Sequence, residues 1–509
     1  MKTKRMAINM IANIVSFVVN AGISILLTPH IVRNLGGEAY GFIPLANNFV
    51  SYVSIITVAL NSMASRFISI EIVAKNHKKA NLYFNSVLIA NIVMSLFLMI
   101  PSIMIILNLE NILRIPDHLL SDVRMTFVFV FINTILALIF NVFSIVTFAT
   151  NRLDLRSIRM IQGYMIRVIV IVALFFLFDP KIYFVTATTI VVTIFTSITD
   201  MKYTKKLLPF IKLKWSEFQW SLVKTLISSG IWNSLNQVSS VLTSTIDLLI
   251  ANMMIDSVAG GQFAIVKTIP LFIQAFAAML SNVFTPQFVI LYAKKETKEL
   301  TATILNSTKI SGLMMTLPIS FLLIMGDIFY SLWTPDEDIQ KLQALSIWVL
   351  LPLVISGSIQ TLFNIYSVTN KLKVPSLVLF VNGLLNSALT LLLLRYTTLD
   401  LFAIASVTAI LSMVRDLVFT PVYAAKCLNL KWTTFYKSIL NGFIYSAVTL
   451  VIVISIRLLF SIESWSALIL SGFVTSLFAL GININIAFGR KKVNEWMRHL
   501  KRMVFKVSI

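Results

Sequence analysis

Residues 7–31 read AINMIANIVSFVVNAGISILLTPHI and follow a basic start that contains Lys2, Lys4 and Arg5. A basic start before an apolar run is typical of a secretory signal. This run, however, continues to about Ile31, which is long enough to cross a bilayer, and many similar runs follow it. We therefore expect residues 7–31 to form a transmembrane helix that is retained in the mature protein.

The composition excludes a water-soluble globule. The 509 residues are 58% hydrophobic and only 12% charged, with a mean hydropathy of +0.88, so there is too little polar surface to face water. A net charge of +21 is also found in nucleic-acid binders, but here the basic residues lie in short clusters between apolar runs, and we expect no nucleic-acid partner. The single Cys427 and four scattered histidines favour neither a disulfide framework nor a metal site, and no cofactor is expected.

The apolar runs predict fourteen transmembrane helices, because each needs roughly 20 apolar residues to cross the bilayer. The first half of the chain holds runs near residues 7–31, 42–64, 80–107, 124–148, 160–178, 182–201 and 225–251. The second half holds runs near residues 262–290, 304–325, 344–367, 376–394, 401–423, 440–456 and 467–488. We therefore expect an all-α integral membrane protein.

The basic residues between these runs predict the orientation. Thirty of the 42 lysines and arginines lie at the two termini and in every second connection, whereas the opposite connections hold seven. Because connections rich in Lys and Arg remain in the cytoplasm, we expect both termini there. The protein would then be a multi-pass protein of a bacterial cytoplasmic (inner) membrane, surrounded by its lipids.

The two halves of the chain align weakly at an offset of 223 residues, with Gly37 over Gly260 and Tyr40 over Phe263. The alignment predicts two pseudo-symmetric six-helix bundles and two additional helices, an arrangement common in transporters. The expected divisions are an N-terminal bundle (1–201), a basic cytoplasmic linker (202–224), a C-terminal bundle (225–425), two further transmembrane helices (426–488) and a basic cytoplasmic tail (489–509). The linker is either an amphipathic segment on the inner leaflet or a plain basic connection, and a short basic helix is expected up to Lys506.

Polar side chains recur on one face of four predicted helices. They include Asn13 and Asn20 on the first helix, Asn47 and Asn61 on the second, Asn233 and Asn236 on the seventh, and Gln274 on the eighth. Small polar residues also hold packed helices together. Their recurrence at matching places in both halves nevertheless favours a hydrated cavity.

Charged residues inside the apolar runs are costly and therefore indicate function. The basic ones are Arg66, Arg167, Lys267, Lys309 and Arg415, and the acidic ones are Asp247 and Asp416. By these boundaries, Arg66, Arg167 and Lys309 lie within a few residues of the inner end, where they could extend to the headgroups. Arg415 and Asp416 lie deepest, and as neighbours on a helix they are not expected to pair well with each other. Asp247 would bind a coupling cation or neutralise Lys267.

A surplus of positive charge selects an anionic ligand, and arginine binds phosphate through two parallel hydrogen bonds. The five basic residues are therefore candidates for substrate binding, and the amide stripes for lining the cavity. A pyrophosphate-linked sugar fits this combination, because the amides and hydroxyls suit a glycan. No catalytic residue is expected.

The chain resembles the polysaccharide transporter, or O-antigen flippase, branch of the multidrug, oligosaccharidyl-lipid and polysaccharide exporter superfamily. The resemblance rests on the turn Leu35-Gly36-Gly37-Glu38-Ala39-Tyr40-Gly41, on Ser65-Arg66-Phe67, and on the basic start before an asparagine-containing helix. It implies two helical bundles in an inverted V with a cationic lumen. It also implies alternating access that moves an undecaprenyl-diphosphate-linked oligosaccharide from the inner to the outer leaflet for O-antigen or capsule synthesis, with proton or sodium coupling.

Two alternatives remain. A cation-coupled multidrug exporter of the same fold would need Asp247 and Asp416 but not the basic residues. A membrane-embedded polysaccharide polymerase or glycosyltransferase would need clustered carboxylates in a large loop. The acidic turn Asp336-Glu337-Asp338 is the only cluster, and it is typical of a solvated outer loop.

Overall fold

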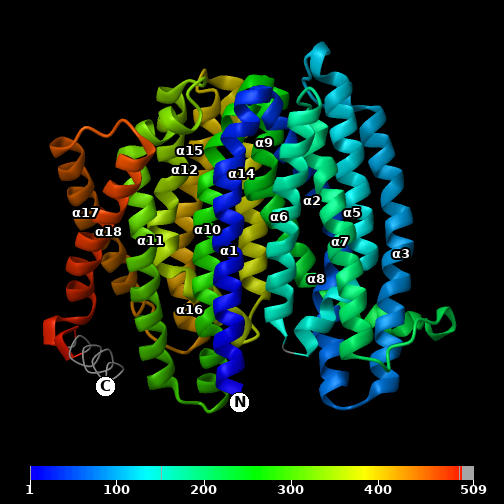
Figure 1. The fold of residues 1–509 in the computed structure, drawn as a ribbon. Helices are drawn as coiled ribbons and strands as arrows, with labels where there is room; N and C mark the ends of the chain where they lie inside the picture. Colours follow the sequence, from blue (N-terminus) through cyan, green and yellow to red (C-terminus); the bar gives the residue numbers. More distant parts are fainter. Residues whose placement is uncertain (1, 151, 492, 496–509) are drawn as a thin grey trace, which may run out of the picture. The chain divides into compact units, whose positions relative to one another are not determined.

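The computed structural model describes residues 2–150, 152–491 and 493–495, and side chains from residue 11 onward. These residues form helices and no strand (Figure 1). The first half contains α1 (Lys2–Leu35), α2 (Gly37–Val73), α3 (His77–Leu107), α4 (Leu109–Ile112), α5 (Leu120–Ala149), α6 (Leu153–Leu177), α7 (Ile182–Leu207), α8 (Trp220–Ser240) and α9 (Ile246–Ile250). The second half contains α10 (Ser257–Ala293), α11 (Thr297–Trp333), α12 (Ile339–Ile359), α13 (Phe363–Val368), α14 (Lys373–Tyr396), α15 (Leu401–Val414), α16 (Thr420–Cys427), α17 (Tyr436–Leu459) and α18 (Trp465–Phe488).

Within the described residues, fourteen helical segments are long and apolar enough to cross a membrane, which confirms the predicted number. Three of these spans are interrupted in their interior by a π-helical or 3₁₀ stretch. In the seventh, the π-helix η3 (Val241–Thr245) joins α8 to α9, and a second π-helix, η4 (Ala251–Ile255), follows α9. In the twelfth, the π-helix η6 (Arg415–Phe419) joins α15 to α16. The tenth joins α12 and α13 through a 3₁₀ turn. The cytoplasmic location of the termini stays a prediction, and most of the basic helix expected up to Lys506 lies outside the described residues.

The helices are longer than the apolar runs that predict them. Helices α2, α10 and α11 each contain 37 residues, or about 55 Å at 1.5 Å per residue. Such a helix exceeds a hydrocarbon layer of about 30 Å. The polar first and last turns therefore continue the helix beyond the apolar run.

The contacts divide the chain into two compact units. The first contains the residues up to Ile265 together with Ser376–Ile404, and the second contains Val266–Pro375 together with the chain from Ala405 onward. In the first unit, α2 packs against α3, α5 and α8, and α1 packs against α6 (Figure 1). In the second, α11 packs against α12, α17 and α18.

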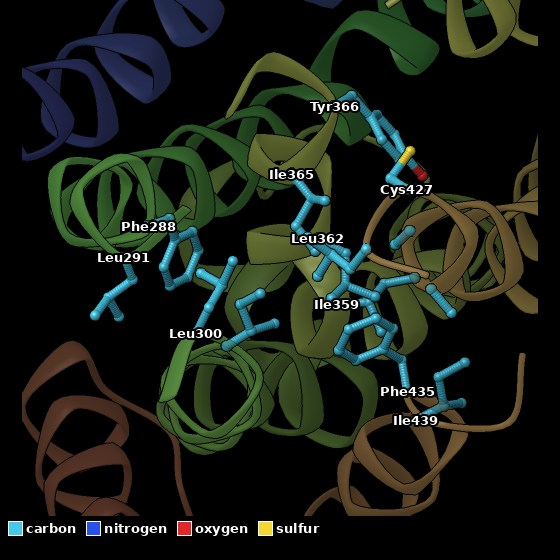
Figure 2. Packing of buried hydrophobic residues seen from close by; sticks show 14 of the residues in the cluster. Phe288, Leu291, Leu300, Ile359, Leu362, Ile365, Tyr366, Cys427, Phe435 and Ile439 are labelled. Atoms are coloured by element: carbon cyan, nitrogen blue, oxygen red, sulfur yellow. The ribbon is translucent and has the colours of Figure 1, made fainter. Parts of the chain in front are cut away.

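Each unit has its own apolar core. The first unit buries Leu60, Phe84, Val146 and Leu226 from four different helices. The second buries a cluster in which Phe288, Leu300, Ile359 and Phe435 meet, with Cys427 beside Tyr366 (Figure 2). Since these side chains are almost fully removed from solvent and lipid, packing between helices holds each unit together.

Glycines allow two very close helix contacts in the first unit. A side chain at Gly230 of α8 would collide with the Ala59 carbonyl oxygen of α2. A Cβ at Gly41 would lie 2.7 Å from the Gly261 Cα, and one at Gly261 would collide with the Gly37 carbonyl oxygen. The beginnings of α2 and α10, which the 223-residue offset aligns, are therefore in direct backbone contact.

Candidate functional site

Arg167 is an arginine in the middle of a membrane span. It is the fifteenth of the 25 residues of α6, and its side chain is half-buried. Helix α6 begins at Leu153, before the apolar run at residue 160, and the depth of Arg167 in the membrane stays a prediction. The Arg167 Cα lies about 21 Å along the helix from the first residue of α6.

No carboxylate neutralises Arg167 among the residues that the structure describes. Its side chain has no hydrogen bond or ion pair there, and its Nε is buried without an acceptor. The hydroxyls of Tyr40 and Tyr164 interact with it electrostatically. An unpaired, partly desolvated cation in a span is costly, and an anionic ligand would remove that cost.

Arg159, two turns earlier on α6, shows the opposite arrangement. Its guanidinium forms an ion pair with the carboxylate of Asp200 on α7, and both side chains are less than a tenth exposed. This pair joins α6 to α7 and leaves no charge for a ligand. Arg159 lies just before the apolar run that begins at residue 160, so the sequence predicted it to be in a loop. The pair was therefore not predicted.

The remaining basic candidate of the first unit is exposed. Arg66 lies seven residues before the end of α2, has an exposed side chain and no hydrogen bond or ion pair within the described part of the chain. Its position near the helix end agrees with a side chain that extends to the headgroups.

The basic candidates of the second unit differ in their contacts. The Lys309 Nζ donates a hydrogen bond of 2.7 Å to the Ala487 carbonyl and lies 5.3 Å from the ring centre of Phe488. It therefore binds the last turn of α18, where a cation also meets the negative end of the helix dipole. Lys267 is half-buried and is the eleventh residue of α10, and Gln274, two turns later, is exposed.

Arg415 and Asp416 form a two-pronged ion pair in the second unit. The Arg415 Nε lies 2.8 Å from Asp416 Oδ1, and its Nη2 lies 2.9 Å from Oδ2. The expectation that these neighbours pair poorly is wrong, because the long arginine side chain bends back along the π-helix η6 to the adjacent carboxylate. Thr420 also donates to Asp416. The charge of Arg415 is thus already matched within its own helix.

Asp247 is fully buried in a broken helix of the first unit. Its residue lies in α9, between the π-helices η3 and η4, and its Oδ1 accepts a hydrogen bond of 3.2 Å from the Asn386 amide of α14. The Thr245 carbonyl, at the end of the π-helix η3, accepts hydrogen bonds from Asn48 and Tyr52 of α2. A buried carboxylate beside irregular backbone is suited to take up a proton or a small cation. The alternative role for Asp247, neutralising Lys267, stays a prediction.

The asparagines of the predicted stripes make different contacts. Asn61 exchanges hydrogen bonds with Asn91 at 3.0 and 3.1 Å and accepts another from Asn141, so three helices meet through amides. The Asn233 amide donates to Ser62, and Asn13 accepts from Ser157. These asparagines therefore hold helices together. Asn91, Asn141 and Asn386 were not among the candidates, although each interrupts an apolar run.

Three other asparagines have side-chain atoms that no neighbouring helix uses. Asn47 is exposed and donates only to its own helix, at the Ile43 carbonyl. Asn20 is half-buried and has no hydrogen bond within the described part of the chain. The Oδ1 of Asn236 is buried without a donor. These three retain the cavity-lining role that the sequence predicts, and whether they share one chamber stays a prediction.

The sequence is similar to one uncharacterized membrane protein, EpsK of Bacillus subtilis strain 168, with 29% identity over 472 residues that cover 93% of each chain. No family model matches the chain.

Solved structures with similar folds are transporters. An inward-facing multidrug resistance MATE family transporter of the MOP superfamily has a TM-score of 0.64 at 14% identity, covering 81% of this chain and 94% of its own. An outward-facing one has a TM-score of 0.58 at 15% identity, with 84% and 94% coverage. A MOP superfamily transporter from Pyrococcus furiosus, described as having a binding pocket of reverse polarity that suggests a different function, has a TM-score of 0.60 at 14% identity, with 84% and 96% coverage. This membrane protein therefore has the fold of the MATE and MOP superfamily transporters.

Proposed function

We propose that the protein is a flippase that moves an undecaprenyl-diphosphate-linked oligosaccharide from the inner to the outer leaflet of a bacterial inner membrane, for O-antigen or capsule synthesis. The observation that carries the proposal is Arg167, a guanidinium halfway along a membrane helix with no carboxylate partner in the described chain. A guanidinium at that depth favours a phosphate or pyrophosphate group over a cationic drug.

The comparisons support a transport mechanism at the level of the fold. Transporters with this fold have been solved in inward-facing and outward-facing conformations, which is the pair of states that alternating access requires. The Pyrococcus furiosus protein is described as having a pocket of reversed polarity, so the fold accommodates pockets of different charge. On this proposal, the termini and the 202–224 linker face the cytoplasm, and two six-helix bundles open alternately to the two sides.

Replacing Arg167 with alanine is expected to lower the export of the glycan about tenfold or more. A charge-assisted hydrogen bond contributes roughly 1.5–3 kcal/mol, and about 1.4 kcal/mol corresponds to a factor of ten. Arg167→Lys keeps the charge but not the two parallel donors, so it should restore part of the activity. The measurement is the polymer at the surface of a deletion strain that carries each variant, at equal protein levels.

Arg156→Ala is the matched control, because Arg156 is exposed at the beginning of the same helix. We expect this variant to export like the unchanged protein. Equal export by Arg167→Ala and Arg156→Ala would remove the support for a phosphate site on α6. Accumulation of one undecaprenyl-linked oligosaccharide in the deletion strain would identify both activity and substrate.

The buried Asp247 favours a second candidate, a cation-coupled exporter of the same fold. On the flippase proposal, Asp247 carries the proton or sodium ion that couples transport to a gradient, whereas Asp416 is occupied by Arg415. We expect Asp247→Asn to abolish the dependence of transport on a pH or sodium gradient in proteoliposomes, while binding of undecaprenyl diphosphate is unchanged. Because asparagine has nearly the size of aspartate, we expect the Asp247→Asn variant to fold like the unchanged protein.

The two variants together distinguish the candidates. A drug exporter would lose activity in Asp247→Asn and keep it in Arg167→Ala. Loss of glycan export in Arg167→Ala, with or without gradient dependence, favours the flippase. Unchanged gradient dependence in Asp247→Asn would exclude Asp247 from coupling.

A further inference from the structure

The connection between α7 and α8 is an irregular segment that is fixed to α3. We call residues 208–219 the strap; it contains one 3₁₀ turn at Trp215–Glu217 and no other helix. Asn85 of α3 accepts from the Lys214 N–H at 3.0 Å and donates to the Lys212 carbonyl at 2.9 Å. Asn81 accepts from the Lys212 N–H at 2.9 Å, and Ser86 accepts from the Gln219 N–H at 3.0 Å. Side chains of α3 thus bind the strap backbone groups that a regular helix would pair with one another.

One side of the strap is buried. Leu208 is only 4% exposed and joins the apolar core of the first unit, and Phe210 packs against that core with its ring 4.1 Å from the His77 ring. Asn81, Asn85 and Ser86 are themselves buried. Because buried amides that lose their partners are destabilising, this side of the strap is fixed relative to α3.

The other side presents large apolar side chains between lysines. Trp215 is 71% exposed, Leu213 is 57% exposed, and Trp220, the first residue of α8, is 63% exposed. Lys212 and Lys214 are exposed beside them. Exposed indole rings on a fixed segment are unfavourable in water, but they are suited to the headgroup layer, where one end of the ring is apolar and the other is wet.

We propose that the strap binds anionic phospholipid headgroups, with Lys212 and Lys214 contacting the phosphates and Trp215 and Trp220 entering the interface. The position of the strap favours a lipid surface over a soluble partner. It joins two consecutive candidate spans, which end at Leu207 and begin at Trp220, so both of its ends lie at the surface of the bilayer. The combination of lysine and tryptophan matches the chemistry of that surface.

The test uses the full chain in nanodiscs of brominated phosphatidylglycerol or brominated phosphatidylcholine. Bromine quenches nearby tryptophans, and the contribution of the strap is the quenching that Trp215→Phe/Trp220→Phe removes. We expect this contribution to be larger with phosphatidylglycerol. Lys212→Ala/Lys214→Ala should remove most of this preference, because the two lysines provide the attraction to anionic headgroups. Glu217, 3.8 Å from Lys214, reduces that attraction without cancelling it.

Lys294→Ala/Lys298→Ala is the matched control, because it removes the same charge from two exposed positions, one just after α10 and one in the first turn of α11. This variant should keep the preference for phosphatidylglycerol. An equal preference in the two lysine variants would overturn the proposal, as would quenching that does not change in Trp215→Phe/Trp220→Phe. Neither outcome bears on Arg167, so the flippase proposal is tested separately.

Discussion

Asp200→Ala is expected to destabilise the protein by about 3–5 kcal/mol, which is the usual cost of removing one partner of a buried ion pair. The Arg159 guanidinium is 7% exposed and depends on Asp200 for its counter-charge. Without the carboxylate, a cation remains between α6 and α7 in the interior of the first unit. The measurements are the midpoint of thermal unfolding of the purified protein in detergent and its unfolding as a function of denaturant concentration.

The double variant Arg159→Met/Asp200→Leu is the decisive comparison. It removes both charges and replaces them with apolar side chains, a change that is often nearly neutral. We expect its midpoint to be close to that of the unchanged protein and well above that of Asp200→Ala. If Asp200→Ala is as stable as the double variant, the pair carries no buried charge that needs compensation, and the contact between α6 and α7 rests on packing alone.

Gly230→Ala is expected to cost about 3 kcal/mol, at the upper end of the usual effect of overpacking. The added methyl would collide with the Ala59 carbonyl oxygen, which is a backbone atom and cannot move without moving α2. Helices α2 and α8 would have to separate, which would also weaken the hydrogen bonds from Asn233 to Ser62 and from Ser234 to the Ile55 carbonyl. The same denaturation measurement in detergent detects the loss.

Gly481→Ala controls for the change of residue type. Gly481 lies in α18, and a Cβ there would meet nothing within 4 Å. Since alanine favours a helix over glycine by about 1 kcal/mol, this variant should be slightly stabilised. A midpoint for Gly230→Ala equal to that for Gly481→Ala would contradict the close contact between α2 and α8.

The sequence predicts the number of spans well, because each span needs a long run of apolar residues and no other part of this chain supplies one. It predicts the ends of the helices poorly. The first two turns of α6 contain Asp154, Arg156 and Arg159, which read as a loop, although a helix that protrudes from the membrane can carry charges. Counted from the start of the apolar run, Arg167 is the eighth residue, whereas it is the fifteenth residue of α6.

Pairings between helices were beyond the reach of the sequence. Asp247 and Asn386 are 139 positions apart, and nothing in either local pattern indicates the other. The pairing of Arg415 with its neighbour Asp416 depends on a π-helix, which periodicity at 3.6 residues per turn does not reveal. The sequence therefore indicates which polar positions interrupt the apolar runs, whereas only the structure shows their partners.

Helix α10 belongs to both compact units, because the division falls between Ile265 and Val266. Its first residues touch α2 through Gly261, and Pro270 lies one turn after the division. Proline lacks an N–H, so the Val266 carbonyl has no helical donor four residues later. A bend of α10 at Pro270 would therefore break no hydrogen bond at that position, because proline supplies none there.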